Sequence, residues 1–322
     1  MSDESTAAST APASTAPRFD VRDFARTAVG SHRSEMDLSV FNENPLPHTV
    51  VQLLAYAREL ERSTMTYLRN VLVTPTHKDA RVTAFLTTWA YEKYWIADSF
   101  EVVVRAHGVD PAEAETLSRF RAFALEVAER ATPIVESFRA NAIGTDVIGL
   151  HMASVAVDEW ITEAAYTRLI AEAPHPVLTP LLEHVLEVKA RHRLFVEPDA
   201  RRRLAESPKA RSLARRALPR IDWPIGAASL ARSDTALFYE ELIDEGLAEA
   251  IDAKAGALPG LESLHLVTNA RRAALTGPHS SGSSGSGSRS SGSTSTMGRR
   301  LGRLAAGLAH TLRSTTKGGT NG

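Results

Sequence analysis

The sequence contains no cysteine. This absence excludes disulfides, thiolate metal sites, iron–sulfur clusters and a cysteine nucleophile. Lysine is also scarce, because only six of the 37 basic residues are lysine and the rest are arginine. No apolar run approaches the roughly 18 residues of a membrane span. Any metal ion in this chain would therefore be held by oxygen and nitrogen ligands, and each lysine departs from the chain's usual choice of arginine.

Positive and negative charges nearly cancel. The 322 residues include 37 Lys and Arg against 38 Asp and Glu, with a formal net charge of −1. This balance argues against a nucleic-acid partner. The first residues are rich in Ser, Thr, Ala and Pro and lack the apolar stretch of a secretory signal, so we expect a cytoplasmic protein.

Apolar residues recur at steps of three and four over most of the chain. The first such stretch, from Pro45 to Leu72, predicts a long amphipathic helix. Further long helices are predicted over 79–106, 111–140, 145–173 and 176–205, and no segment has the alternation of a strand. Long helices joined by short Gly- or Pro-containing breaks are typical of an antiparallel bundle, so we predict an all-α fold.

Composition divides the chain into five parts. A tail without periodicity is expected to be disordered, and a Gly/Ser linker is expected to be flexible. The predicted parts are the tail at 1–18, the helical bundle at 19–208, a small helical appendage at 209–274, the linker at 275–297 and a short basic amphipathic segment at 298–322.

Acids and histidines on the predicted helices match one known architecture. Carboxylate-bridged di-metal proteins use a four-helix bundle, with a single Glu on each of two helices and a Glu-x-x-His pair on each of the other two. Residues i and i+3 share a helix face, so a carboxylate and an imidazole can reach the same ion.

Two segments resemble the ferritin-like superfamily, in particular the acyl-carrier-protein desaturase type and its actinobacterial di-iron relatives. TTWAYEKYWIADSF is similar to the family's Trp-x-x-Glu-Glu-x-x-His segment, with Trp89 and Glu92 in place. EVKARHRLF is similar to the Glu-x-Arg-His segment, with Arg191 and His192 in place. The resemblance covers about residues 45–205 and implies a ferritin-like bundle.

The resemblance also implies two single carboxylates. Glu61 would supply the first, from the segment ARELERSTMTYLR. Either Glu159 or Glu163 would supply the second, from the segment VDEWITEAAYTRL.

Three positions depart from the family pattern. Lys93 and Ile96 stand where the family has the Glu and His of its first pair, and Lys189 stands where it has the Glu of its second pair. Two like unit charges 4 Å apart repel by roughly 4 kcal/mol even at an effective dielectric constant near 20. We therefore interpret the lysines as ammonium groups that replace metal charge and balance buried carboxylates, and no cofactor is predicted.

Simpler explanations exist for the same residues. Lys93 could point to solvent while Glu92 faces inward, because one residue rotates a helix by about 100°. His192 could be a surface histidine, and Glu159 with Glu163 could form a solvated helix edge.

Three functions follow from these patterns. The leading hypothesis is a bundle that has lost its di-metal centre and binds a ligand or a partner protein without oxidative chemistry. The alternative from the enzyme class is a di-iron oxidase with two iron ions, acting on an acyl or other apolar substrate, and at least five inward acids or histidines would favour it. A third hypothesis is metal-free redox chemistry at a core tyrosine.

The basic residues suggest partners. Between 189 and 220 the chain has eleven Lys or Arg against three acids. The desaturase resemblance implies that this face docks an acidic protein such as an acyl carrier protein. The basic segment at 298–317 could contact an anionic membrane peripherally, pack on a partner, or be disordered. The resemblance also implies a homodimer.

Overall fold

The computed structural model describes residues 19–108 and 144–276. Within these two ranges the regular elements are helices, without a strand, and the predicted all-α fold is confirmed. Several predicted parts lie outside the described residues. They are the tail at 1–18, the predicted helix over 111–140, the linker from residue 277 onward and the whole basic C-terminal segment.

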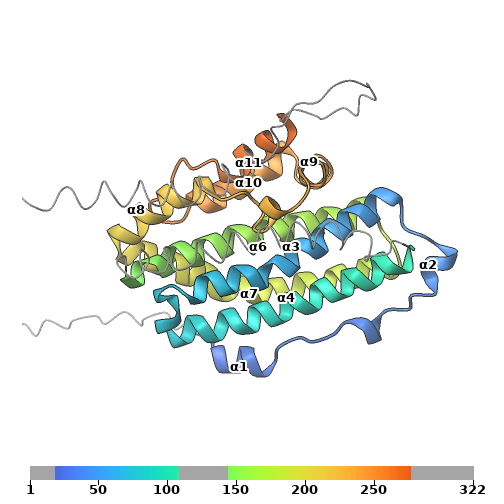
Figure 1. The fold of residues 1–322 in the computed structure, drawn as a ribbon, viewed down its shortest axis with the longest axis horizontal. Helices are drawn as coiled ribbons and strands as arrows, with labels where there is room; N and C mark the ends of the chain where they lie inside the picture. The colour runs from blue at the N-terminus through green and yellow to red at the C-terminus, as the bar shows by residue number, and fades with distance from the viewer. Residues whose placement is uncertain (1–18, 109–143, 277–322) are drawn as a thin grey trace, which may run out of the picture.

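Four long helices pack side by side as a bundle (Figure 1). They are α3 (His48–Leu72), α4 (Ala80–Ala106), α6 (Val147–Glu172) and α7 (Leu178–Glu206). All four begin within a few residues of the predicted starts. A single 3-10 turn, η2 (Pro75–Lys78), joins α3 to α4, and a five-residue connection, 173–177, joins α6 to α7. Such short connections force each pair of helices to be antiparallel.

The segment before α3 lies along the outside of the bundle (Figure 1). It contains α1 (Val21–Arg26), the 3-10 turn η1 (Arg33–Glu35) and α2 (Val40–Glu43). Phe24 of α1 is buried and stacks on Phe85 of α4, with ring centroids 5.4 Å apart. The sequence predicted that this segment belongs to the bundle but predicted no element within it.

The C-terminal helices cover one side of the bundle (Figure 1). They are α8 (Pro208–Ala217), α9 (Arg232–Glu241), α10 (Glu245–Gly256) and α11 (Leu266–Thr276), with 3-10 turns η4 (Leu218–Arg220) and η5 (Ala227–Ser229). Gly149 lets α8 approach α6 closely, because a Cβ at this position would lie 3.1 Å from Cβ of Ala210. Buried side chains of the appendage, such as Leu213 and Phe238, belong to the same hydrophobic core as the bundle. None of the described helices is both long enough and apolar enough to cross a membrane.

Candidate functional site

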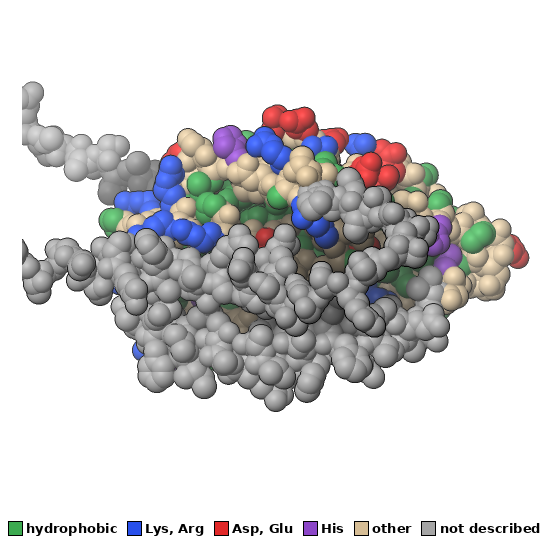
Figure 2. Space-filling view, turned by 45° about the horizontal axis from the view of Figure 1, so that its top comes forward, with side chains coloured by type: hydrophobic (Ala, Val, Ile, Leu, Met, Phe, Trp, Pro, Cys, Tyr) green, Lys and Arg blue, Asp and Glu red, His purple; other side chains and the backbone are tan. Residues whose placement is uncertain are grey.

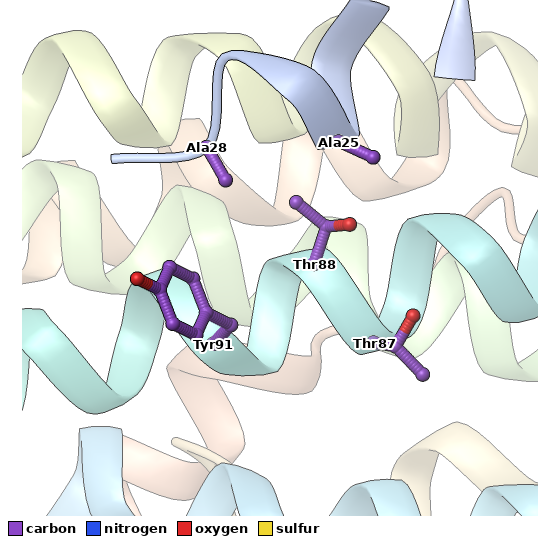
Figure 3. A pocket seen from close by; sticks show the side chains of 5 residues that line it. All are labelled: Ala25, Ala28, Thr87, Thr88 and Tyr91. Carbon is purple, nitrogen blue, oxygen red and sulfur yellow. The ribbon is translucent and has the colours of Figure 1, made fainter. Parts of the chain in front are cut away.

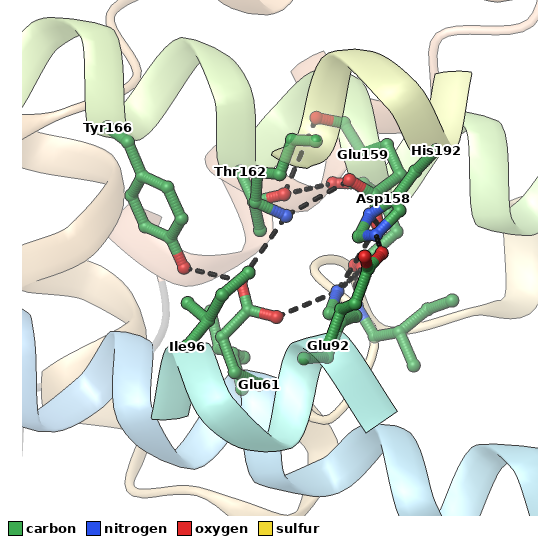
Figure 4. A network of polar contacts seen from close by, with 12 residues as sticks. Glu61, Glu92, Ile96, Asp158, Glu159, Thr162, Tyr166 and His192 are labelled. Atoms are coloured by element: carbon green, nitrogen blue, oxygen red, sulfur yellow. Dashed lines mark hydrogen bonds and ion pairs between the residues drawn. The ribbon is translucent and has the colours of Figure 1, made fainter. Parts of the chain in front are cut away.

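A network of polar contacts lies at the centre of the bundle, where Glu61, Asp158 and Glu159 point toward one another (Figure 4). The ammonium group of Lys93 contacts all three carboxylates. Its Nζ lies 3.0 Å from Oε2 of Glu61, 3.2 Å from Oδ2 of Asp158 and 3.5 Å from Oε1 of Glu159. The side chain extends inward from α4 and is 1% exposed. Lys93 therefore faces the bundle interior, and the explanation that it points to solvent is wrong.

Lys189 of α7 reaches the same centre from the opposite side. Its Nζ lies 3.0 Å from Oε2 of Glu159 and 3.3 Å from Oε1 of Glu61. Lys189, Glu61 and Glu159 are each no more than 1% exposed. Two ammonium groups thus lie among the carboxylates of two helices, α3 and α6, which is the arrangement that the charge-balance hypothesis requires.

A second part of the network joins His192 to Glu92. Nε2 of His192 lies 2.8 Å from Oε2 of Glu92, and Nδ1 of the same ring lies 3.5 Å from Oε1 of Glu159. The other oxygen of Glu92 accepts a hydrogen bond of 2.8 Å from the backbone amide of Val29 and lies 3.3 Å from the guanidinium of Arg191. The segment after α1 therefore covers this end of the network. His192 is buried, so it is not a surface histidine.

The buried groups shift one another's ionisation. Burial alone would raise the pKa of Glu61, but attraction to Lys189 and Lys93 outweighs burial and lowers it. Burial would also raise the pKa of Glu159, but attraction to Lys189 and Lys93 outweighs burial and holds this pKa well below its usual value. Burial would lower the pKa of His192, but its carboxylate neighbours Glu159 and Glu92 outweigh burial and raise it.

With His192 protonated, the charges of the network balance. The four acids are Glu61, Glu92, Asp158 and Glu159, and the four bases are Lys93, Lys189, Arg191 and His192. A buried charge without a partner costs several kcal/mol, whereas a paired and hydrogen-bonded set removes most of that penalty.

Two aromatic side chains complete the hydrogen bonding of the carboxylates. The indole Nε1 of Trp89 donates to Oε1 of Glu159 at 2.7 Å. The hydroxyl of Tyr166 donates to Oε1 of Glu61 at 2.6 Å, and Figure 4 shows this ring reaching across from α6. Burial and then the charge of Glu61 raise the pKa of Tyr166 well above its usual value, so the phenol stays protonated.

Asp158 is the member of the network that sequence reasoning missed. Its Oδ2 contacts Lys93, and its Oδ1 accepts a hydrogen bond of 2.8 Å from the backbone amide of Ile225, in the loop after α8. Asp158 and Glu159 are consecutive acids in an otherwise apolar part of α6, and this pairing was the signal that could have identified Asp158.

Two predicted site residues make no polar contact with the network. Oε2 of Glu163 lies 2.8 Å from Nε of Arg193, and the side chain is 26% exposed, so of the two predicted acids Glu159, and not Glu163, belongs to the network. Ile96 is fully buried beside the network and offers no ligand atom (Figure 4).

The residues present do not fit two iron ions. The network contains five acids or histidines, Glu61, Glu92, Asp158, Glu159 and His192, which reaches the number that the oxidase hypothesis asked for. However, both lysine ammonium groups lie between these carboxylates, at the contact distances given above. A cation at the same place would be repelled by two positive charges, and lysine in its protonated form has no lone pair to donate.

The basic face predicted over 189–220 is smaller than expected, because Lys189 is buried in the core. Ion pairs with acids occupy Arg191, Arg193, Arg202 and Arg203. Other arginines of this stretch contact backbone carbonyls. Nη1 of Arg215 donates to the backbone carbonyl of Glu262 at 2.9 Å, and Nη1 of Arg201 donates to that of Ala257 at 2.8 Å. Carbonyl oxygens carry no net charge, so these contacts leave the positive charge in place. Figure 2 shows Lys and Arg gathered at the end of the molecule that carries α8.

A surface cleft of about 440 Å³ lies between α1 and α4, apart from the polar network. Figure 3 shows its lining, which is small or hydroxyl-bearing: Ala25, Ala28, Thr87, Thr88 and Tyr91. These side chains offer no carboxylate, imidazole or amine, so the hydroxyls of Thr87, Thr88 and Tyr91 are the polar groups that the lining supplies.

Comparison with known proteins found no matching family model, no matching curated protein and no matching solved structure.

Proposed function

We propose that this chain is a ferritin-like bundle in which the ammonium groups of Lys93 and Lys189 replace a di-metal centre, and that it binds a partner protein without oxidative chemistry. The supporting observation is that each ammonium group contacts both Glu61 and Glu159 while fully buried. The centre of the bundle is thereby neutralised without a metal ion.

The buried network favours a partner on the surface over a ligand in the interior. Carboxylates, ammonium groups and the rings of Trp89 and Tyr166 contact one another along the bundle axis. An apolar ligand placed there would have to separate paired charges, which is costly in a buried site.

An acidic protein, such as an acyl carrier protein, is the partner proposed for the basic face. Exposed arginines there are Arg201, near the end of α7, Arg215 on α8, and Arg220 just after α8. Complementary charge of this kind increases association rates and makes binding salt-dependent.

Iron loading tests the first part of the proposal. Purified protein is incubated anaerobically with ferrous iron and desalted, and iron per chain is measured. The wild type is expected to retain no iron in the core, whereas Lys93→Glu/Ile96→His/Lys189→Glu restores three ligands and is expected to gain iron. Near two iron ions per wild-type chain would instead support the di-iron oxidase, which is the candidate that the four inward acids and one inward histidine favour.

Binding to an acyl carrier protein tests the second part. Titration at low salt is expected to give an affinity that falls as salt is added and falls further in Arg220→Glu. Arg272→Glu is the matched control, because Arg272 is an exposed arginine on α11, outside the basic face. Equal loss of affinity in both variants would argue against docking at residues 189–220.

A further inference from the structure

A cluster of metal-ligand side chains lies outside the core network, between the N-terminal segment and α7. His32, Glu35 and His184 each offer one ligand atom, and these atoms lie within 4.8 Å of one another. Nδ1 of His184 is 3.7 Å from Oε2 of Glu35, and the ring centroids of His32 and His184 are 4.9 Å apart. Two imidazoles and one carboxylate form a donor set that zinc sites use.

One tight turn places two of these ligands together. The amide of Glu35 donates to the carbonyl of His32 at 3.1 Å and closes the 3-10 turn η1. Side chains three residues apart eclipse in a 3-10 helix, so His32 and Glu35 project on the same side. Arg33, between them, forms a two-pronged ion pair with Asp98 of α4, with N–O distances of 2.7 and 2.6 Å, and this pair fixes the turn against the bundle.

His32 has an unsatisfied nitrogen at this position. The residue is 1% exposed, and its Nδ1 is buried without a hydrogen-bond partner among the described residues. A buried polar group without a partner costs about 1–3 kcal/mol.

The other two ligands leave the cluster open to solvent. The side chains of Glu35 and His184 are 57% and 36% exposed. An ion can therefore enter from the surface, and Glu35 is free to rotate toward it. Ligand atoms around tetrahedral zinc lie about 3.3 Å apart, so a shift on the order of 1.5 Å or less closes the cluster.

We infer that His32, Glu35 and His184 bind one divalent transition-metal ion, with Zn²⁺ the best match to the donor set. Three protein ligands leave a fourth position for water. The bound ion would tie the turn at residues 32–35 to α7. This inference is independent of the proposed function, because none of its three ligands contacts Lys93 or Lys189.

Zinc binding to the full chain tests this inference. The metal-free protein is titrated with Zn²⁺ against a chromophoric chelator, and one Zn²⁺ per chain is expected. His184→Ala is expected to lose this binding, since it removes a partly exposed ligand without emptying the core. His48→Ala, at an exposed histidine that begins α3, is the matched control and is expected to keep one Zn²⁺ per chain.

Two further measurements keep the test decisive. Co²⁺ in place of Zn²⁺ is expected to give visible absorption bands that are lost in His184→Ala and weakened in Glu35→Gln. Saturating Zn²⁺ is expected to raise the unfolding temperature of the wild type but not of His184→Ala. Unchanged zinc stoichiometry in His184→Ala, or no binding to the wild type, would overturn the inference. Metal that the wild type binds and His184→Ala does not bind is assigned to the surface cluster. Iron that His184→Ala still binds is assigned to the core, so the two proposals can fail separately.

Discussion

Lys93 of α4 and Lys189 of α7 contact the same two carboxylates, those of Glu61 and Glu159. Each ammonium group has one contact of 3.0 Å, Lys93 with Glu61 and Lys189 with Glu159. These four residues come from the four long helices of the bundle and link all of them, and the contacts of His192 with Glu92 and Glu159 add a second set of links. Removing one member leaves a charge buried without its partner, which makes the network testable by single substitutions.

Lys189→Met is expected to destabilise the protein by about 3–5 kcal/mol at pH 7, the cost of removing one partner from a buried ion pair. Methionine preserves most of the side-chain volume, so the loss reports charge rather than packing. Urea unfolding measures the change in the free energy of unfolding. Lys254→Met, at an exposed lysine of α10, is the control and is expected to change stability by less than about 1 kcal/mol. Equal effects of the two substitutions would contradict a buried charge network.

Glu159→Gln is expected to cost more stability than Asp158→Asn, although the two acids are adjacent. The pKa of Glu159 lies well below its usual value, because the lysines outweigh burial. The pKa of Asp158 is raised, because burial outweighs the attraction of Lys93. Folding therefore favours the charged form of Glu159 but not that of Asp158. Urea unfolding of both variants at pH 7 compares the two costs, and a larger loss in Asp158→Asn would contradict this assignment.

His192 is expected to make stability depend on pH near neutrality. Its pKa is raised in the folded state, so its contribution is fully present below the unfolded value of 6.5 and is lost as the pH rises through the folded pKa. The difference in unfolding free energy between wild type and His192→Gln is expected to shrink over this range. Taking the difference cancels other histidines, including His151, whose pKa burial lowers to about 4. A difference that grows with pH would show that His192 is buried in its neutral form.

Tyr166→Phe is expected to cost about 1.5–3 kcal/mol, the range for a hydrogen bond to a charged group. The lost bond is the 2.6 Å contact with Glu61. Tyr67→Phe is the control, because its hydroxyl bonds the neutral Ser154 at 2.7 Å, and it is expected to cost about 0.5–1.5 kcal/mol. Electron paramagnetic resonance of the wild type tests the tyrosine-redox alternative in parallel, since a tyrosyl radical signal that disappears in Tyr166→Phe would favour it.

Much of the fold follows from hydrophobic periodicity, because long amphipathic helices bury one stripe over many turns. The bounds of α3, α4, α6 and α7 were predicted within a few residues. The sequence predicted no helix within residues 19–44, because the short helices there are stabilised by tertiary contacts and show no local hydrophobic pattern. Phe24 against Phe85, and the amide of Val29 on Glu92, are contacts of this kind.

The network could be only partly predicted. Helical spacing places Lys93, three residues before Ile96, and Lys189, three residues before His192, on inward faces. Spacing also implies that neighbouring residues diverge by about 100°, which favours only one acid of Asp158 and Glu159. Asp158 belongs to the network as well as Glu159, because the backbone amide of Ile225, in a loop far along the chain, donates a hydrogen bond to Asp158. The same limit applies to the cluster of His32 and His184, whose sequence separation carries no pattern.

Anomalous X-ray diffraction at the iron absorption edge, from wild-type crystals soaked anaerobically in ferrous iron, shows whether lysine or metal occupies the centre of the bundle. We expect no iron peak between Glu61 and Glu159, with electron density for the Lys93 and Lys189 ammonium groups in contact with both carboxylates. An iron peak coordinated by Glu61, Glu159 or His192, with either lysine displaced, would contradict this expectation.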